Sequence, residues 1–475
     1  MKIISLLSSA LFGLAATLSS QAADLPADAK PAKPNIVIIM ADDLGWNAVG
    51  YHNAEVKTPH LDQFCKEGIE LDQFYVSPMC SPTRAGTMTG RYPIRFGCAR
   101  AVIPPWRDYG VPTDEVMLPQ ALAKAGYAQR GAFGKWHLGH AQKKWHPNSR
   151  GFTEFVGCYN GAIDYFTFER DGELDWHHNE KPIKPTGYAT EVTGDAAVNF
   201  IEKAAQNEDP FFCYVAFNAP HSPFQAPENY LSKYKHIKNE KKRTYYAMIT
   251  VMDDQIGRIL ASLEKSGEEK DTIVWFFSDN GGVGDIKKNN LPLKGSKLTT
   301  FDGGVRSVAC VRYPKGYPSG KKTTEQMAFI DVLPTLLSAA GISPESLDCK
   351  PIDGLDLNPV LSGKAESLPT RDLYFYHGQS GEKTETIAIN SAPWKLIMNG
   401  PSLAGDDSKN HKINLFKLGE DPEESKDLSQ SQSEIVDELM KKLIAFRKLQ
   451  PANAIPAYGV GKEGFTAPKD WKITD

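Results

Sequence analysis

Apolar residues occur along the chain in short uninterrupted runs, and longer amphipathic stretches separate these runs. The first run covers residues 35–40, and similar runs cover residues 211–217 and 272–277. Runs of this length are typical of strands that are covered on both faces of a sheet. Residues 245–265 instead place their apolar side chains on one helical face and end before Gly267. This alternation predicts an α/β fold, in which helices sandwich a large and mostly parallel sheet.

The hydrophobic pattern changes near residue 365, where short apolar segments separated by polar turns replace the longer runs. These segments cover residues 373–377, 386–390, 394–398 and 413–417. An amphipathic stretch follows at residues 433–448. The pattern predicts a smaller C-terminal antiparallel sheet with one packed helix. We therefore expect a catalytic domain over residues 33–365 and a C-terminal α+β subdomain over residues 366–475.

The first residues are typical of an export signal. Lys2 precedes a mostly apolar stretch at residues 3–18, and small residues lead to a cleavage site after Ala22. This predicts a signal peptide over residues 1–22 and an exported protein, either periplasmic or secreted. No later segment has the length and apolar continuity that a membrane span needs, so we expect none.

Composition excludes several other classes of protein. The 54 basic and 58 acidic residues leave a net charge of −4, which gives no electrostatic reason to expect a nucleic acid partner. The seven cysteines are scattered and odd in number, so they do not predict a disulfide framework. None of them stands in a C-x-x-C pair, which argues against a structural zinc site.

Polar and reactive side chains follow four of the predicted strands. Ligands bind beyond the carboxyl ends of the strands in an open parallel sheet, so these side chains are expected to share one edge. The chain thereby predicts a functional site at that edge. Its members are Asp42 and Asp43 after residues 35–40, Lys135 and His137 after residues 126–133, His221 after residues 211–217, and Asp279 and Asn280 after residues 272–277.

The acidic residues of this set indicate a metal site. Three carboxylates and one amide oxygen would repel each other unless a cation joined them. Oxygen donors without histidine or cysteine suit Ca²⁺ or Mg²⁺ better than zinc. The alternative is that such acidic pairs are merely solvated, as we expect for Asp253 and Asp254 in the middle of a helix. The sequence Asp279-Asn280-Gly281 is also a good turn sequence.

A second candidate is the segment that starts at Cys80. We expect Ser81 to cap a helix and Pro82 to occupy its first position, which places Cys80 at the helix N-terminus. The helix dipole and Arg84, one turn further on, would favour an anionic or highly polar group at position 80. A buried structural cysteine is the commoner explanation of this pattern taken alone.

Residues 79–97, which read MCSPTRAGTMTGRYPIRFG, resemble the signature of the type I, formylglycine-dependent sulfatase family. Residues 41–46 and 278–281 resemble the two metal motifs of that family, and residues 134–139 resemble its second signature. Residues 295–297, followed by residues 302–306, resemble its sulfate-binding lysine segment. The resemblance implies an alkaline-phosphatase-like fold. It also implies that a maturation enzyme oxidises Cys80 to formylglycine and that the site holds one Ca²⁺.

The same resemblance implies a role for each site residue. One hydroxyl of the formylglycine hydrate attacks sulfur, and the other helps to expel sulfate by re-forming the aldehyde. Arg84 orients the hydrate, and His137 takes the proton of the second hydroxyl. Further residues surround the sulfate, namely Lys135, His221 and Lys297. The metal ligands are Asp42, Asp43, Asp279 and Asn280, together with the modified Cys80.

Residues 41–62 and several later segments are especially similar to N-acetylgalactosamine-4-sulfatases. This implies a galactose or N-acetylgalactosamine 4-sulfate in a sulfated carbohydrate, either a glycosaminoglycan or an algal galactan such as carrageenan. The family pattern is broken at Gln129 and at Asp302, which stand where other residues are usual. Candidate sugar contacts are Trp106, Arg107, His140, Asp164, Glu169, Trp176 and His177.

Three other interpretations fit parts of the pattern. One is a phosphatase or phosphodiesterase of the same superfamily fold, but such enzymes usually use serine or threonine with histidine-rich two-metal sites. Another is a thiol hydrolase that pairs unmodified Cys80 with His137 or His221, which would leave the acidic cluster without a purpose. The third is a catalytically silent carbohydrate-binding protein, although every expected catalytic position is filled.

Overall fold

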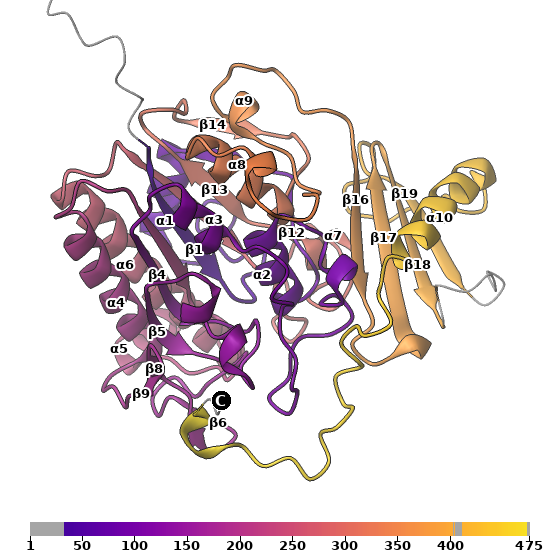
Figure 1. The fold of residues 1–475 in the computed structure, drawn as a ribbon. Helices are drawn as coiled ribbons and strands as arrows, with labels where there is room; N and C mark the ends of the chain where they lie inside the picture. Colours follow the sequence, from indigo (N-terminus) through magenta and orange to yellow (C-terminus); the bar gives the residue numbers. More distant parts are fainter. Residues whose placement is uncertain (1–32, 402, 404–410, 473–475) are drawn as a thin grey trace, which may run out of the picture. The chain divides into compact units, whose positions relative to one another are not determined.

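A computed structural model describes residues 33–401, 403 and 411–472. A ten-stranded sheet forms its centre (Figure 1). In spatial order, the strands are β14 (Lys321–Thr323), β2 (Ile69–Leu71), β13 (Ala309–Arg312), β11 (Thr272–Ser278), β1 (Asn35–Ala41), β10 (Phe211–Ala216), β4 (Gln129–Lys135), β5 (Glu154–Cys158), β8 (His177–His178) and β9 (Lys181–Pro182).

The five central strands, β11, β1, β10, β4 and β5, run parallel, whereas β13 and β8 pair antiparallel with the outer two of them. The prediction of a mostly parallel sheet is confirmed for this centre. The register aligns Ala41 with Ser278, Met40 with Ala216, and Ala216 with Gly134. The carboxyl ends of four strands therefore meet at one edge, as the sequence predicts.

Helices cover both faces of the sheet because β1 sends alternate side chains to opposite sides. Ile36, Ile38 and Met40 belong to one core, and Val37 and Ile39 belong to the other. The first core contains α2 (Cys80–Thr89), α3 (Leu118–Lys124) and α8 (Val332–Ala339). The second contains α1 (Pro59–Glu67), α4 (Ala189–Ala204) and α6 (Glu240–Lys265).

The start of α6 differs from the prediction of residue 245, because the helix begins at Glu240. Asn239 caps it, and its side-chain oxygen accepts a hydrogen bond from the backbone N–H of Lys242 at 2.9 Å. The first turn of α6 carries basic and exposed residues, so the apolar periodicity marks only the later part of the helix.

Smaller elements complete the large part of the chain. A three-stranded sheet and a two-stranded hairpin lie outside the main sheet. The former comprises β12 (Arg306–Ser307), β3 (Phe74–Tyr75) and β15 (Met327–Ala328), and the latter β6 (Glu169–Arg170) and β7 (Glu173–Leu174). Three short helices are α5 (Glu228–Leu231), α7 (Asp302–Val305) and α9 (Asn358–Leu361).

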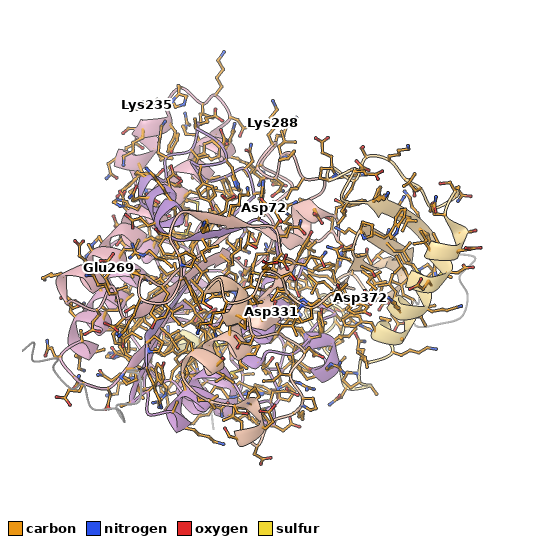
Figure 2. The ribbon with its side chains drawn as sticks, turned by 90° about the horizontal axis from the view of Figure 1, so that it is seen from above. Asp72, Lys235, Glu269, Lys288, Asp331 and Asp372 are labelled. Atoms are coloured by element: carbon orange, nitrogen blue, oxygen red, sulfur yellow. A yellow bond between two sulfur atoms is a disulfide. The ribbon has the colours of Figure 1, made fainter. Side chains whose placement is uncertain are left out.

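The C-terminal sheet is antiparallel and has four strands, as predicted. Ion pairs connect it to helical segments of the preceding chain: Arg371, directly before β16, pairs with Asp331 at 2.6 Å, and Lys395 of β18 pairs with Asp302, the first residue of α7, also at 2.6 Å. In Figure 2, Asp331 lies among other side chains, whereas Lys235 and Lys288 project at the outer edge of the view. The strands are β16 (Asp372–His377), β17 (Glu385–Ser391), β18 (Trp394–Gly400) and β19 (Lys412–Lys417), and helix α10 (Ser433–Arg447) follows them. The division into domains at residue 365 stays a prediction.

The segment after α10, residues 451–472, leaves the small sheet and returns to the large one. It is drawn in yellow in Figure 1 and passes close to β6. The backbone N–H of Ile455 donates to the carbonyl of Gly97 at 2.9 Å, and the indole N–H of Trp471 donates to the carbonyl of Arg170 at 2.9 Å. We call this segment the C-terminal tail.

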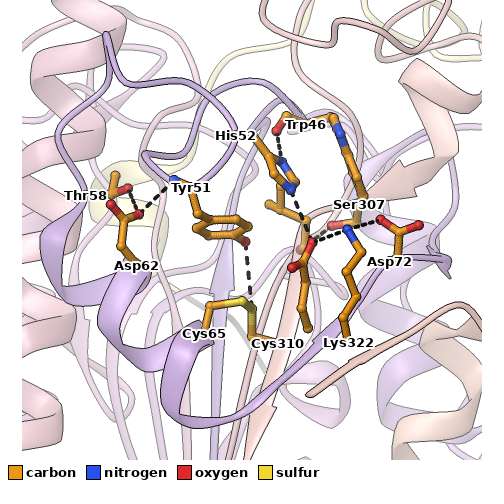
Figure 3. The surroundings of a disulfide bond; sticks show 12 residues. Trp46, Tyr51, His52, Thr58, Asp62, Cys65, Asp72, Ser307, Cys310 and Lys322 are labelled. Carbon is orange, nitrogen blue, oxygen red and sulfur yellow. Dashed lines mark hydrogen bonds and ion pairs between the residues drawn. A yellow bond between two sulfur atoms is a disulfide. The ribbon is translucent and has the colours of Figure 1, made fainter. Parts of the chain in front are cut away.

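A disulfide joins Cys65 of α1 to Cys310 of β13 (Figure 3). The two residues are 245 positions apart and both are buried. The hydroxyl of Tyr51 lies 3.8 Å from the sulfur of Cys310. The scattered cysteines gave no sign of this pair, because only the fold brings α1 beside β13.

Exchanging both Cys65 and Cys310 for alanine will lower the free energy of unfolding by about 2–4 kcal/mol, because the bond closes a long loop in the unfolded chain. Chemical denaturation of the wild-type protein and of the double variant, with the other cysteines unchanged, measures this difference in the free energy of unfolding. Exchange of the unpaired Cys349 for alanine is the control, and an equal loss there would contradict a specific role for the disulfide.

In the part of the chain that the structure describes, no helix combines the length and apolarity that crossing a membrane requires. The predicted signal peptide at residues 1–22 lies outside the described residues.

Candidate active site

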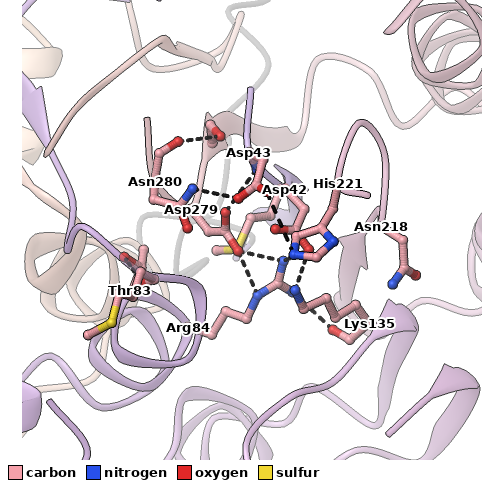
Figure 4. Close-up of polar contacts among 12 residues, drawn as sticks. Asp42, Asp43, Thr83, Arg84, Lys135, Asn218, His221, Asp279 and Asn280 are labelled. Atoms are coloured by element: carbon pink, nitrogen blue, oxygen red, sulfur yellow. Dashed lines mark hydrogen bonds and ion pairs between the residues drawn. The ribbon is translucent and has the colours of Figure 1, made fainter. Parts of the chain in front are cut away.

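The four strand ends bring the predicted residues together at one place (Figure 4). Asp42 and Asp43 follow β1 directly, and Asp279 and Asn280 follow β11. The backbone of Asp43 has a φ of 67°, so the chain turns sharply there and presents both carboxylates to the same side as Asp279. The amide N–H of Asp43 donates to Oδ1 of Asp279 at 3.3 Å, and Nδ2 of Asn280 donates to Oδ1 of Asp43 at 2.7 Å.

Each carboxylate of this cluster has a different cationic side chain of the protein as its closest partner. All three carboxylates are buried, so each charge needs a close partner. The pairs are Lys135 with Asp42, Lys297 with Asp43 at 2.6 Å, and Arg84 with Asp279 at 2.9 Å.

Side-chain cations do not satisfy every oxygen of the cluster. Oδ1 of Asp42 and Oδ1 of Asn280 are buried and accept no hydrogen bond from any residue that the structure describes. One ligand atom each of Asp42, Cys80 and Asp279 lie within 4.8 Å of one another. Unpaired oxygen atoms of carboxylates and amides are the donors that Ca²⁺ prefers. The residues therefore fit the predicted calcium site.

The electrostatics of the cluster support the same interpretation. Burial, together with the charges of Asp42 and Asp43, raises the pKa of Asp279 to about 6, although Arg84 and Lys135 oppose the rise. Burial also raises the pKa of Asp42. A divalent cation would stabilise the ionised form of both groups.

Asp43 behaves differently because its neighbours Lys297, His221 and Asn280 together outweigh the effect of burial on its pKa. Burial opposes its ionisation, but Lys297 and then His221 act against that effect, and the pKa falls below the usual range. Asp43 is therefore ionised at neutral pH even without a metal ion.

Cys80 is the first residue of α2, and the residue before the helix is Met79. The prediction that Ser81 caps the helix and that Pro82 begins it is therefore wrong by two residues. The hydroxyl of Ser81 instead accepts a hydrogen bond from the backbone N–H of Ile103 at 3.2 Å. Cys80 nevertheless lies in the first turn of the helix, close to the positive end of the helix dipole, as expected. This position favours an anionic or highly polar group at residue 80.

The environment of Cys80 does not favour a thiolate. The side chain is buried, with 2% of its surface exposed. Burial raises the pKa of the thiol, although Lys135 and Lys297 act in the opposite direction. A protonated thiol is a weak nucleophile, which argues against the thiol hydrolase interpretation.

Arg84 lies beneath the site and connects three of its elements. Its guanidinium donates to Oδ2 of Asp279 at 2.9 Å through Nε and to the carbonyl of Lys135 at 3.0 Å through a terminal nitrogen. Another terminal nitrogen lies 3.5 Å from Oδ2 of Asp42. The side chain is fully buried, and its contacts with Asp279 and Asp42 hold these two carboxylates in place.

His137 lies two residues beyond β4, in a backbone conformation with a φ of 57°. Its Nε2 is 3.0 Å from the carbonyl of Ile103, and its Nδ1 is buried without a partner in the described chain. Burial, followed by Lys135 and Arg84, lowers the pKa of His137 well below the usual value. The ring is therefore neutral near pH 7, and its Nδ1 is open to a hydrogen bond from a bound group.

Exchanging Gly161 for alanine will lower kcat by about 100-fold, because a displacement of about 1 Å at a catalytic group has an effect of that size. A Cβ atom at position 161 would meet Cε1 of His137 at 2.4 Å, so the ring must move. Steady-state kinetics with an aryl sulfate measures the effect. Gly419→Ala is the matched control, since a Cβ there has nothing within 4 Å. Equal kcat values for the two variants would show that the ring position is not critical.

His221 and Lys297 approach Asp43 from two loops. Nε2 of His221 lies 3.6 Å from Oδ2 of Asp43, and its Nδ1 lies 2.6 Å from the carbonyl of Ser222. Burial lowers the pKa of His221 to about 3; Asp43 opposes this effect, and Lys297 adds to it. His221 is therefore a neutral hydrogen-bonding group here, whereas Lys297 is a permanent cation.

A pocket of about 150 Å³ opens over these residues. Cys80, His137, His221 and Lys297 form its reactive wall. Residues that the sequence did not point to complete the pocket. They are Val102, Ile103, Pro104, Pro105, Gly161, Ala162, Arg170, Gln379 and Tyr458.

The sugar contacts expected from the sequence lie mostly elsewhere. Trp176 and His177 are fully buried in the packing, and His140 packs edge-on against Trp471. Asp164 accepts hydrogen bonds from the backbone of its own turn. Trp106, Arg107 and Glu169 do not line the pocket, but each lies close in sequence to a residue that does.

The expectation that Asp253 is solvated is wrong, because this side chain is fully buried. Its two oxygens accept hydrogen bonds from the backbone N–H groups of Leu61, at 2.8 Å, and His60, at 3.1 Å. These are donors of the first turn of α1, so Asp253 satisfies a helix N-terminus from a neighbouring helix. The hydrophobic pattern of one helix gives no sign of such a contact.

Comparison with known families gives two matches. The family model described as Sulfatase matches residues 34–342, and the model described as N-sulphoglucosamine sulphohydrolase, C-terminal, matches residues 296–449. The chain is 32% identical to arylsulfatase J of Mus musculus over 466 residues, which cover 88% of this chain and 76% of that protein. It is also 32% identical to the N-acetylgalactosamine-6-sulfatase of Canis lupus familiaris, with 88% and 86% covered.

Solved structures agree with these matches. The structure of Ps i-CgsB in complex with k-i-k-neocarrahexaose superposes with a TM-score of 0.80 at 30% identity, and the match covers 88% of this chain and 94% of that one. The putative sulfatase yidJ from Bacteroides fragilis superposes with a TM-score of 0.73 at 23% identity, which supports the fold. The predicted alkaline-phosphatase-like architecture is thereby confirmed. The chain belongs to the sulfatase family and is a sulfuric ester hydrolase.

Proposed function

We propose that this sulfatase removes sulfate from a sulfated polysaccharide, with formylglycine made from Cys80 as the nucleophilic group and a calcium ion beside it. The observation that carries this proposal is the position of Cys80. Its sulfur lies within 4.8 Å of carboxylate oxygens of Asp42 and Asp279, at the base of a pocket lined by Lys297 and two histidines. A phosphatase of the same fold is the alternative, but Cys80 would have no role in it.

Four side chains would hold the ion, namely Asp42, Asp43, Asp279 and Asn280. When bound, Ca²⁺ supplies a positive charge that polarises the nucleophilic group and a sulfate oxygen. Formylglycine, when formed, supplies a hydrated aldehyde with two hydroxyls. Arg84, in α2, hydrogen-bonds both Asp279 and the carbonyl of Lys135 at the end of β4, which keeps Asp279 close to α2.

The remaining residues act on the sulfate and on protons. Lys297 and Lys135 place positive charge where the sulfate ester binds, which stabilises the transferring group. Nδ1 of His137 is free of hydrogen bonds within the described chain and accepts a proton as sulfate is released. His221 hydrogen-bonds the ester, and the negative charge of bound sulfate raises its pKa toward a value at which it protonates the leaving oxygen.

The substrate class is proposed from sequence resemblance and from relatives. Residues 41–62 resemble N-acetylgalactosamine-4-sulfatases, and the solved relative Ps i-CgsB holds k-i-k-neocarrahexaose. We propose a galactose or N-acetylgalactosamine sulfate, at position 4, in a glycosaminoglycan or a galactan such as carrageenan. Curated relatives include N-acetylgalactosamine-6-sulfatases, so sulfate release from matched 4-sulfated and 6-sulfated oligosaccharides is the deciding comparison.

Mass spectrometry of the peptide that contains Cys80 tests the chemistry directly. The protein is expressed with and without a formylglycine-generating maturation enzyme, and the fraction converted is compared with the rate on an aryl sulfate and on an aryl phosphate. We expect activity on the sulfate to rise in proportion to conversion. Full activity in a preparation with an unmodified thiol would sink the proposal, and a preference for the phosphate would support the alternative.

We also propose that the protein is exported, either to the periplasm or outside the cell. The supporting observations are the signal-like residues 1–22 and the disulfide between Cys65 and Cys310, since disulfides persist mainly in oxidising compartments. Detection of the processed protein in a periplasmic or culture fraction of its host would test this.

A further inference from the structure

The C-terminal tail builds one wall of the active-site pocket. Tyr458 of the tail lines the pocket together with Cys80 and Gln379, although the tail follows the helix of the small sheet. The backbone N–H of Tyr458 donates to the carbonyl of Gln379 at 2.8 Å, and the indole N–H of Trp106 donates to the carbonyl of Tyr458 at 3.0 Å. The Trp106 and Tyr458 rings also pack edge-on at 4.8 Å. Tyr458 is therefore held in place from two sides.

The same tail fixes a cationic residue of the pocket, Arg170, at the end of β6. The indole N–H of Trp471 donates to the carbonyl of Arg170 at 2.9 Å. Glu173, in the facing strand β7, accepts from the backbone of Asp470 at 3.1 Å and from Lys469 at 3.2 Å. The tail thereby holds the β6–β7 hairpin on both strands, and Figure 1 draws it in yellow close to β6.

The positive charge of Arg170 is only partly balanced by carboxylates of the described residues. Across residues 33–401, 403 and 411–472, its ion pairing is limited to Asp171, which Nε contacts at 3.2 Å. Asp171 is itself 42% exposed at its side chain. The two terminal nitrogens of Arg170 therefore have no carboxylate partner among the described residues, although the side chain lines the pocket. A guanidinium in this state binds a carboxylate or a sulfate with two parallel hydrogen bonds.

The sulfate ester that reacts does not need Arg170. Lys297 and His221, which line the pocket, already lie beside Asp43, and the buried Lys135 pairs with Asp42. Arg170 is contributed by a different wall, together with the tail. A second cation among the lining residues of the pocket is suited to a second negative group on the same ligand.

We propose that Arg170, with Tyr458 beside it, binds a second anionic group of the saccharide, on the sugar next to the one that loses its sulfate. This inference rests on the proposed function and narrows it to saccharides with more than one negative charge. The group is a sulfate ester or a carboxylate, each of which presents two negatively charged oxygens that a guanidinium can bind with two parallel hydrogen bonds. Tyr458 contributes a ring face to the sugar and a hydroxyl to the group. Arg170 is thus a specificity residue, fixed by the C-terminal tail.

The test compares three oligosaccharides of equal length with the same reactive sulfate. The first has no other charge, the second has an additional sulfate on the adjoining sugar, and the third has a carboxylate there. We expect the wild-type protein to prefer one of the doubly charged substrates about tenfold in kcat/KM, since a charged hydrogen bond has an effect of that size. In Arg170→Gln, this preference will fall to near one, through KM rather than kcat, and Arg170→Lys will retain part of it.

Arg258→Gln is the matched control, because Arg258 is exposed on α6 and pairs with Asp195. It removes the same charge and is expected to leave the preference as in the wild type. An equal loss on all three substrates in Arg170→Gln, or an unchanged preference, would overturn the inference. Absence of sulfate release by the wild-type protein from every substrate, an aryl sulfate included, would instead count against the proposed function. The relative size of the effects on the second and third substrates identifies the group.

Discussion

Exchanging Cys80 for serine will lower steady-state turnover of sulfate esters by about 10⁴-fold or more, the size of effect that loss of a nucleophile has in other hydrolases. The reason is chemical. Serine has one hydroxyl, which is able to take up a sulfate group but has no second hydroxyl with which to expel it. We therefore expect a single turnover that leaves the protein carrying one sulfate group. Intact-protein mass spectrometry after exposure to an aryl sulfate measures this adduct, and a continuous assay measures turnover.

Cys349→Ser is the control for this experiment, because Cys349 is a free cysteine that does not line the active-site pocket. It is expected to change turnover less than twofold. Wild-type rates in Cys80→Ser would show that the residue is not the nucleophile. Loss of turnover in Cys80→Ser with no covalent adduct would argue that position 80 supports the site without reacting.

The central part of the fold is predictable from the sequence because its signals are local. Residues 35–40 form a continuous apolar run, and the structure confirms them as part of β1, at the centre of the sheet. The four strands of the C-terminal sheet and the helix after them are likewise confirmed. Each is a short apolar or amphipathic segment bounded by polar residues, so its signal is also local. The antiparallel edges of the large sheet were not predicted, because strands of two to four residues are too short to show a periodicity.

The site residues also divide into those with a local sequence signal and those without one. Asp42 and Asp279 were predicted because each directly follows a strand, and the register of parallel strands then places them together. Arg170 and Tyr458 were not predicted, because one ends a strand of two residues and the other lies in an irregular tail. Their position in the pocket depends on contacts between segments far apart in the sequence, such as that between Trp471 and Arg170, which are 301 positions apart. Such contacts leave no pattern in a single sequence.

Removing divalent cations will lower kcat/KM for an aryl sulfate by about 10³-fold, because a metal ion contributes several kcal/mol of charge stabilisation and each 1.36 kcal/mol is a factor of ten. Added Ca²⁺ is expected to restore the rate. Asp42→Asn will reproduce most of this loss, since Asp42 provides a buried oxygen that no residue of the described chain satisfies. Calcium titration by calorimetry, on protein without turnover, reports binding separately from catalysis.

The exposed carboxylate of Asp285, which pairs with Lys241 at the surface, provides the matched control. Asp285→Asn removes one negative charge without touching the cluster, so it separates a local effect from a change in net charge. Binding of Ca²⁺ by Asp285→Asn but not by Asp42→Asn places the ion among the strand ends. Full activity in the presence of a strong chelator would mean that Lys135, Lys297 and Arg84 suffice to balance the three carboxylates, and that the free oxygens of Asp42 and Asn280 serve another purpose.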